Sequence, residues 1–276
     1  MSIRIDDLTV TFKNGVTAVD HVDLEIPHGI FGLLGENGAG KTTLMRVLTT
    51  VLAPTSGKVL LDGTLYCEAN YEKIQKKIGY LPQEIDLYPS LTVRECLEYM
   101  GDLAGIEKRE SKKRIDYYLE KTSLADHQKK KMRQLSGGMK RKLMVCRALL
   151  TDPEILLLDE PTAGMDALSR RQMWNLLRKL NEKNLTILLT THYMEEAQNL
   201  CNRVALMDHG KLEEVSTPSA LIESLGAYAV DEMTADGTQN HYFHTRQEAI
   251  RYLEELTGQA SLRAVSYTHL TLPTKA

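Results

Sequence analysis

The chain has 276 residues, of which 42% are hydrophobic and 26% charged, as in globular proteins with a sizeable core. Its formal net charge of −3 gives no general electrostatic case for nucleic-acid binding, and we expect no nucleic-acid partner. The four cysteines form no C-x-x-C pair, which argues against zinc or a disulfide framework. No apolar run approaches the roughly 18 residues of a membrane span, so a membrane role would need a partner.

Residues 3–26 predict short antiparallel strands around the turn signal Asn14-Gly15. Phe12 falls at the end of the first of these strands. Its pattern leaves two interpretations open, an aromatic of the core or sheet edge and a platform on which an adenine stacks. The apolar run at residues 30–34 then predicts a buried strand.

A glycine-rich loop follows that strand. Its residues fit the phosphate-binding pattern G-x-x-x-x-G-K-[ST]: Gly35, Glu36, Asn37, Gly38, Ala39, Gly40, Lys41, Thr42 and Thr43. Glycines let successive backbone N–H groups point at phosphate oxygens, Lys41 would reach the β- and γ-phosphates, and the Thr42 hydroxyl would bind Mg²⁺. Apolar spacing from Leu44 to Leu52 predicts a helix that stops before Pro54. A glycine-rich helix cap is the alternative, but strand, loop and helix together favour a nucleoside-triphosphate site.

The middle of the chain predicts a helical insert between strands. Residues 59–63 and 78–83 predict strands, and residues 92–150, rich in helix formers and charge, predict a mostly helical subdomain at about residues 84–150. The apolar contacts expected within it are Leu97, Met100, Leu103, Ile115, Leu119 and Leu124. We interpret its lysine runs as solvated helix faces.

A continuous apolar strand at residues 155–160 ends in two carboxylates, Asp159 and Glu160. Residues 167–182 and 195–200 predict helices, residues 186–192 a strand that ends at His192, and residues 204–210 a last strand and turn. Strands alternating with helices predict a doubly wound, mostly parallel α/β sheet. Gly35, Gln83, Asp159 and His192 all fall just past strand ends, so we expect them to converge.

The character of the chain changes near residue 225. Residues 228–243 predict a hairpin with a turn at Asp236-Gly237, and Thr245 with Glu248 forms the capping box of a helix that ends at Gly258. Its expected apolar stripe is Ile250, Leu253 and Leu256. We therefore divide the chain into a nucleotide-binding domain at residues 1–220 and a small α/β appendage at residues 221–264. Residues 265–276 are similar to the translation of a sequencing-library adapter, and our hypothesis is that this tail is a sequencing artefact that should be excluded from fold reasoning.

A third motif completes a set. Leu135-Ser136-Gly137-Gly138-Met139 alone reads as an ordinary loop with Ser136 as a helix cap, although helix N-termini also bind phosphate. Together with the phosphate loop, Gln83, Asp159-Glu160, Asp166 and His192, in this order and at these intervals, it resembles the nucleotide-binding domain of ATP-binding cassette (ABC) proteins over residues 3–220. In that family two domains meet head to tail and sandwich two ATP molecules.

The resemblance implies roles for these residues. Residues 35–43 would bind ATP phosphates and Mg²⁺, and Gln83 would contact Mg²⁺ and the attacking water. Asp159 would be the magnesium carboxylate, Glu160 the general base, and His192 would hold the γ-phosphate and support Glu160. Glu160 and His192, together with Lys41 and Gln83, make up the expected catalytic set.

The resemblance also implies roles for residues that would act across the dimer or on the adenine. Ser136, Gly137 and Gly138 would bind the γ-phosphate held by the opposite subunit, Asp166 would act across the dimer, and Phe12 would stack on adenine. The chain departs from the family at two positions: Met139 replaces the commoner glutamine, and Met165 stands where a leucine usually precedes Asp166.

Three classes of cassette protein compete. A chromosome or DNA-repair ATPase has a long coiled coil between phosphate loop and signature, whereas the interval from Lys41 to Leu135 is too short for one. Translation-associated cassettes resemble two cassettes in one chain, whereas one phosphate loop occurs here; such a soluble ribosome-associated ATPase is the runner-up. We favour the ATPase subunit of a bacterial exporter-like transporter, a dimer bound through separate permease chains to the cytoplasmic face of the membrane.

Residues 84–100 are the expected permease contact. The apolar residues there are Leu87, Tyr88, Pro89, Leu91 and Val93. The alternative is that they only pack the helical insert on the core.

Overall fold

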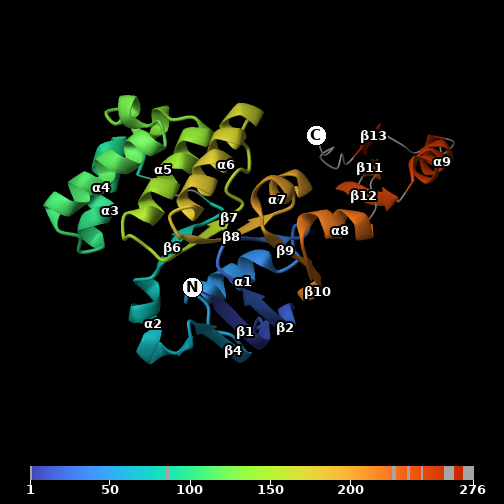
Figure 1. The fold of residues 1–276 in the computed structure, drawn as a ribbon, viewed down its shortest axis with the longest axis horizontal. Helices are drawn as coiled ribbons and strands as arrows, with labels where there is room; N and C mark the ends of the chain where they lie inside the picture. The colour runs from blue at the N-terminus through green and yellow to red at the C-terminus, as the bar shows by residue number, and fades with distance from the viewer. Residues whose placement is uncertain are drawn as a thin grey trace. The chain divides into compact units, whose positions relative to one another are not determined.

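The computed structural model describes residues 2–84, 88–225, 228–234, 237–243, 245–257 and 264–269. The chain divides into two compact units, residues 1–215 and residues 216–276. Within the described ranges the strands form three sheets, two in the first unit and one in the second (Figure 1). The predicted α/β class, with a mostly parallel sheet, an antiparallel sheet and a helical insert, is confirmed.

The first sheet is antiparallel and has the order β2-β1-β4-β5. Its strands are β1 (Ile3–Thr11), β2 (Thr17–Ile26), β4 (Ser56–Leu61) and β5 (Thr64–Leu65). Apolar and polar residues alternate along β1 on either side of an irregularity at Asp6-Asp7, so Ile3, Ile5, Leu8 and Val10 are all buried. The predicted turn at Asn14-Gly15 joins β1 to β2, and Gly15 has the positive φ of 84° that this turn requires.

The central sheet has the order β10-β9-β3-β8-β7-β6, and its strands from β9 to β6 are parallel. These are β3 (Ile30–Leu34), β6 (Ile78–Leu81), β7 (Ile155–Asp159), β8 (Thr186–Thr191), β9 (Arg203–Asp208) and β10 (Lys211–Ser216). Every residue of β3, β7 and β8 is buried, which explains their continuous apolar runs. The carboxyl ends of the parallel strands lie at one edge, where the predicted site residues follow them.

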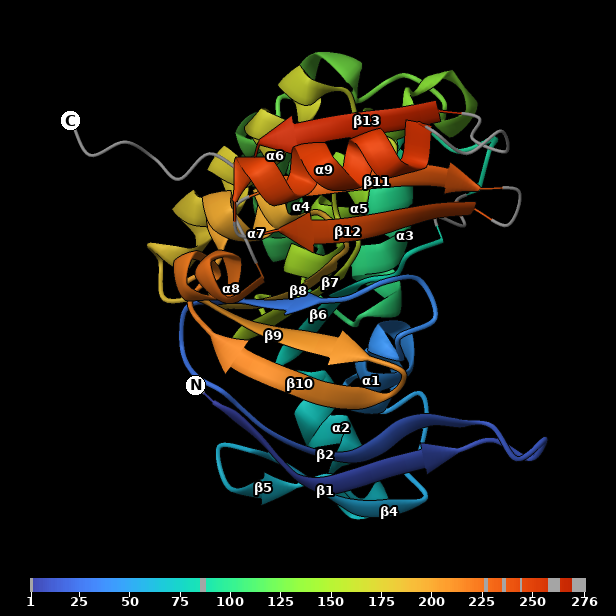
Figure 2. The same ribbon diagram turned by 90° about the vertical axis from the view of Figure 1, so that its right-hand side faces the viewer.

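Helix α1 (Lys41–Leu48) packs between the two sheets (Figure 2). Its Leu44 and Leu48 are fully buried in one core with residues of β1, β2, β7 and β8. The helix is shorter than predicted, because Thr50 adopts a left-handed φ of 61° and both Val51 N and Leu52 N donate to Arg46 O. Val51 is consequently 72% exposed, and the helix predicted from the apolar spacing runs further than α1 does.

A short helix, α2 (Glu68–Gln75), leads to β6, and the helical insert follows. The insert consists of α3 (Val93–Leu103), α4 (Lys108–Lys121), α5 (Gly137–Leu149) and the 3₁₀ turns η1 (Ala125–His127) and η2 (Met132–Gln134). Leu97, Ile115, Leu119 and Leu124 pack in one cluster as expected, with Met100 partly buried. Leu103 was expected there and is 66% exposed; the chain turns after it, and Ile106 packs on the cluster instead.

Helices α6 (Ala167–Asn181) and α7 (Met194–Leu200) flank β8 as predicted. Residues 204–210 form the predicted strand and turn, as β9 and the turn at His209-Gly210, but β9 is not the last strand of the sheet because β10 follows it. This strand was missed because only Leu212 and Val215 interrupt its polar sequence.

The second unit begins with α8 (Pro218–Leu225), to which the sequence analysis assigned no element. The predicted hairpin is present as β11 (Tyr228–Thr234) and β12 (Gly237–Phe243), and β13 (Ala264–His269) pairs with β11 on its other edge. Helix α9 (Arg246–Thr257) opens with the predicted capping box, in which Glu248 N donates to Thr245 Oγ1 and Thr245 N to Glu248 Oε2. Asp236 and Gly258 lie outside the described residues.

The apolar stripe of α9 differs from the prediction at one position. Leu256 is buried and Leu253 partly buried against β11 and β12, but Ile250 is 38% exposed. The fully buried Ala249 takes its place, because a small residue allows the helix to approach the strands closely.

We expect Leu157→Ala to lower the free energy of unfolding by about 2–5 kcal/mol, because Leu157 is fully buried between both sheets and its truncation leaves a cavity. Leu168→Ala removes the same atoms from a side chain that is 68% exposed and should have little effect. Urea denaturation of both variants measures the difference. Equal losses would contradict the assignment of Leu157 to the core.

The origin of the tail is a separate prediction. Residues 265–269 fall in β13 and residues 270–276 lie outside the described ranges. The pairing of β13 with β11 does not show whether the codons for residues 265–276 are genomic or come from an adapter. If they derive from an adapter, long-read sequencing of the locus will show a different sequence after residue 264; genomic codons identical to the printed tail would rule the hypothesis out.

Candidate active site

The phosphate loop joins β3 to α1 and is held by close backbone contacts. Gly35 N donates to Thr191 O at 3.3 Å, which attaches the loop to the end of β8. A Cβ on Gly35 would lie 2.2 Å from Met207 O, and one on Gly40, whose φ is 102°, would lie 2.1 Å from Ala18 O. Glycine is therefore required at Gly35 by packing, and at Gly40 by both packing and backbone conformation.

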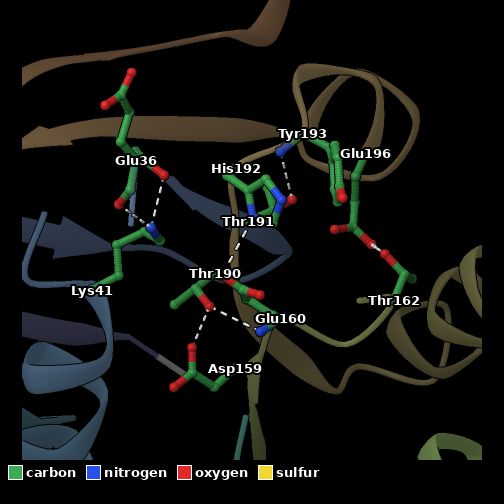
Figure 3. A network of polar contacts seen from close by, with 11 residues as sticks. Glu36, Lys41, Asp159, Glu160, Thr162, Thr190, Thr191, His192, Tyr193 and Glu196 are labelled. Carbon is green, nitrogen blue, oxygen red and sulfur yellow. Dashed lines mark hydrogen bonds and ion pairs between the residues drawn. The ribbon is translucent and has the colours of Figure 1, made fainter. Parts of the chain in front are cut away.

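Lys41 opens α1 and lies beneath the loop. Its side chain is almost fully buried, and Nζ donates to Gly35 O and Glu36 O, both at 2.7 Å (Figure 3). Burial lowers the pKa of this ammonium, while the carboxylates of Glu160, Asp159 and Glu36 act in the opposite direction. Gly40 offers no side chain to cap α1, so the first N–H groups of the helix are available to an anion.

A cavity of about 270 Å³ lies against this loop. The residues that line it are Ala18, Asn37, Gly38, Gly40, Lys41, Thr42, Thr43, Gln83 and Glu160. The structure thus brings most of the predicted phosphate loop together with Gln83, from the end of β6, and Glu160, from the end of β7. Ala39 is buried in the core, and its O accepts from Gly210 N.

Asp159 is the last residue of β7 and is 1% exposed. Its Oδ1 accepts from Thr190 Oγ1 on β8 at 2.5 Å, whereas Oδ2 is buried and has no hydrogen-bond partner among the described residues. An unpaired buried carboxylate oxygen is costly unless a cation or donor satisfies it. Oxygen ligands suit Mg²⁺, so the residues present fit the predicted magnesium site.

Glu160 faces His192 across the ends of two neighbouring strands. His192 Nδ1 lies 3.3 Å from Glu160 Oε1, and the two side chains are 32% and 10% exposed (Figure 3). The Glu160 backbone has a left-handed φ of 48°, and its N donates to Thr190 Oγ1 at 3.0 Å. This conformation turns the chain directly after β7 and directs the carboxylate to the cavity.

Other predicted residues lie apart from the cavity lining. Ser136, exposed at the start of α5, accepts from Met139 N at 3.3 Å, and Gly137 is also exposed. Asp166 caps α6, and hydrogen bonds from Ser169 lower the pKa of its exposed carboxylate. Phe12 is 37% exposed beside the β1–β2 turn, so it is not a core aromatic.

Sequence reasoning missed three residues near the site. Thr190 holds Asp159 and the Glu160 backbone, and its signal was a threonine inside a fully buried strand. Arg141 on α5 is buried and donates from Nη1 to Pro82 O at 3.2 Å, next to Gln83. Burial lowers the pKa of its guanidinium, and the charges of Glu160 and Asp159 oppose this. Arg141 was missed because it sits in a basic run of the sequence, which resembles a solvated helix face. The third missed residue is Glu196, which is buried on α7.

In the part of the chain that the structure describes, no helix combines the length and apolar character needed to cross a membrane.

Comparison with known proteins identifies the family. The family described as "ABC transporter" matches residues 19–163. The linearmycin resistance ATP-binding protein LnrL of Bacillus subtilis is 37% identical over 227 residues, which are 82% of this chain and 72% of that protein. The Nod factor export ATP-binding protein I of Cupriavidus metallidurans is 41% identical over 207 residues, 75% of this chain and 68% of that protein.

Solved structures agree with these sequence matches. The cbiO1 subunit of the cbiONQ ABC transporter complex of Clostridium perfringens has a TM-score of 0.73 at 26% identity, covering 80% of this chain and 90% of that chain. The cassette MJ0796, solved as a dimer in a post-hydrolysis state with ADP and Pi, has a TM-score of 0.71 at 28% identity and covers 78% and 98%. The chain belongs to the ABC transporter family, as an ATP-binding subunit that hydrolyses ATP.

Proposed function

We propose that this subunit drives export through separate permease chains by closing and opening an ATP-dependent dimer. The observation that carries the proposal is the cavity in which the phosphate loop, Gln83 and Glu160 meet, with His192 beside Glu160. The names of LnrL and of the Nod factor protein, a resistance and an export protein, support export over import.

In the proposed reaction, the loop and the α1 N-terminus bind the phosphates, and Lys41 exchanges its carbonyl partners for β- and γ-phosphate oxygens. Glu160 orients a water molecule and accepts its proton as the water attacks the γ-phosphorus, while the bond from phosphorus to the β–γ bridging oxygen breaks and ADP leaves. His192, fixed at the end of β8, supports the Glu160 carboxylate and contacts the γ-phosphate.

Thr42, Gln83 and Asp159 would hold Mg²⁺ beside this cavity. The unpaired Oδ2 of Asp159 and the positions of Thr42 and Gln83 on the lining support this assignment. When bound, the ion would neutralise charge on the phosphate oxygens.

The site is proposed to be complete only in a dimer, which we expect to be a homodimer. Ser136, Gly137 and Gly138 lie outside the lining of their own cavity, and the first two are exposed. They are therefore available to contact the γ-phosphate bound by a second subunit, with Asp166, also exposed, acting across the interface. The dimeric structure of the similar MJ0796 cassette supports this arrangement.

We place the permease contact on the segment after Gln83, which would hold the subunit at the cytoplasmic face of the membrane. Val93 is fully buried and Leu91 partly buried in the insert, so these two take the packing role. Tyr88 and Tyr99 remain 52% and 41% exposed, with their rings edge to face at 5.6 Å. Leu87 lies outside the described residues.

Glu160→Gln should bind ATP, abolish most turnover and accumulate an ATP-bound dimer, because the amide cannot accept the proton from water. ATPase assays and light scattering with ATP measure the two effects. Glu195→Gln, the same change at an α7 side chain that is 64% exposed, is the matched control and should behave as wild type. Wild-type turnover by Glu160→Gln would contradict the base assignment.

The combined variant Tyr88→Asp and Tyr99→Asp should abolish co-purification with a membrane protein, because two charges would have to be buried in an apolar contact. Tyr117→Asp, at a ring that is 37% exposed on α4, is the control and should retain the partner. Affinity purification from solubilised membranes measures recovery. Retention by the double variant would place the contact elsewhere, and recovery of the wild type with ribosomes would favour the runner-up.

A further inference from the structure

A buried carboxylate on α7 joins the loop that follows Glu160 to helix α6. Glu196 is 1% exposed, and its Oε1 accepts from Thr162 Oγ1 at 2.8 Å and from Trp174 Nε1 at 3.1 Å. Thr162, also 1% exposed, belongs to the loop between β7 and α6, and Figure 3 shows its hydroxyl directed at Glu196. A carboxyl group buried this deeply needs hydrogen-bond partners, and these two side chains supply them.

The loop that Glu196 holds begins with a strained residue. Glu160 has a φ of 48°, a region that residues with side chains seldom adopt and that persists only when surrounding contacts impose it. On its amino side, Glu160 N donates to Thr190 Oγ1 at 3.0 Å. On its carboxyl side, Glu160 O accepts from Ala163 N at 3.2 Å, closing a turn that contains Thr162. The Thr162 hydroxyl attaches that turn to Glu196.

We propose that Glu196 is a positioning residue for ATP hydrolysis: through Thr162 it holds the turn from Glu160 to Ala163, and thereby keeps the Glu160 carboxylate beside His192. Glu196 itself is not among the residues that line the cavity. The inference rests on the proposed role of Glu160 as the base.

The two donors to Glu196 Oε1 allow a matched test. Thr162→Val removes the hydrogen bond to the loop and keeps the shape of the side chain, whereas Trp174→Phe removes the bond to α6. We expect Thr162→Val to lower kcat about tenfold with KM for ATP changed by less than about twofold, because the lost contact acts on the chemical step. Trp174→Phe should leave kcat within about twofold of wild type, even where it lowers stability more.

Substitutions of Glu196 give the second arm. Glu196→Leu should reproduce the loss of kcat, and Glu196→Gln should restore most of it, because an amide oxygen still accepts from both donors. Urea denaturation establishes that each variant is folded. Trp174 is the only tryptophan in the chain, so its emission should stay unchanged in Thr162→Val and shift in Glu196→Leu.

Equal kcat losses in Thr162→Val and Trp174→Phe would reduce Glu196 to a structural role, and an unchanged kcat in Thr162→Val would overturn the proposal. Placing Thr162→Val in a Glu160→Gln background separates this from failure of the base assignment. If Thr162 acts through Glu160, it should have no further effect on the residual rate of that variant. A further tenfold loss of kcat in that background would show that Thr162 acts by another route. Wild-type turnover by Glu160→Gln alone would contradict the assignment of Glu160 as the base.

Discussion

The hydroxyl of Thr190 connects the Asp159 carboxylate to the backbone of Glu160. It donates to Asp159 Oδ1 and accepts from Glu160 N, so one buried side chain on β8 sets the directions of two consecutive residues at the end of β7. Because β7 and β8 are buried on both faces and paired in parallel, their ends cannot shift independently. The cavity geometry depends on this cross-strand contact.

The site also contains charged side chains that are buried close to one another. Lys41 and Arg141 are buried cations near two buried carboxylates, and each donates to backbone carbonyls. Burial depresses the pKa of both cations and the carboxylates oppose it, so the charges are interdependent. The remaining buried oxygen, Asp159 Oδ2, has no hydrogen-bond partner among the described residues, which is consistent with the proposed magnesium site.

Neighbouring hydrogen bonds stabilise a strained backbone conformation at the site. Glu160 occupies a left-handed conformation that alone would be unfavourable, and hydrogen bonds hold the chain on both sides of it, from Thr190 and through Thr162 to Glu196. This turn lies between a rigid strand and the loop that leads to Asp166. Buried strands on one side and a buried, hydrogen-bonded turn on the other hold the Glu160 backbone in this conformation.

The sequence alone predicted the phosphate loop, the carboxylate pair, the central-sheet strands β3, β6, β7, β8 and β9 and the α/β class, because short-range spacing carries these signals. It failed where tertiary packing decides: α1 ends at Leu48 although the helical spacing continues, Leu103 faces outward, and β10 pairs despite its polar sequence. The roles of Thr190, Arg141 and Glu196 also emerged only in three dimensions. A buried threonine, arginine or glutamate is recognisable only by its partners, and those partners lie on strands, helices and loops far apart in the chain.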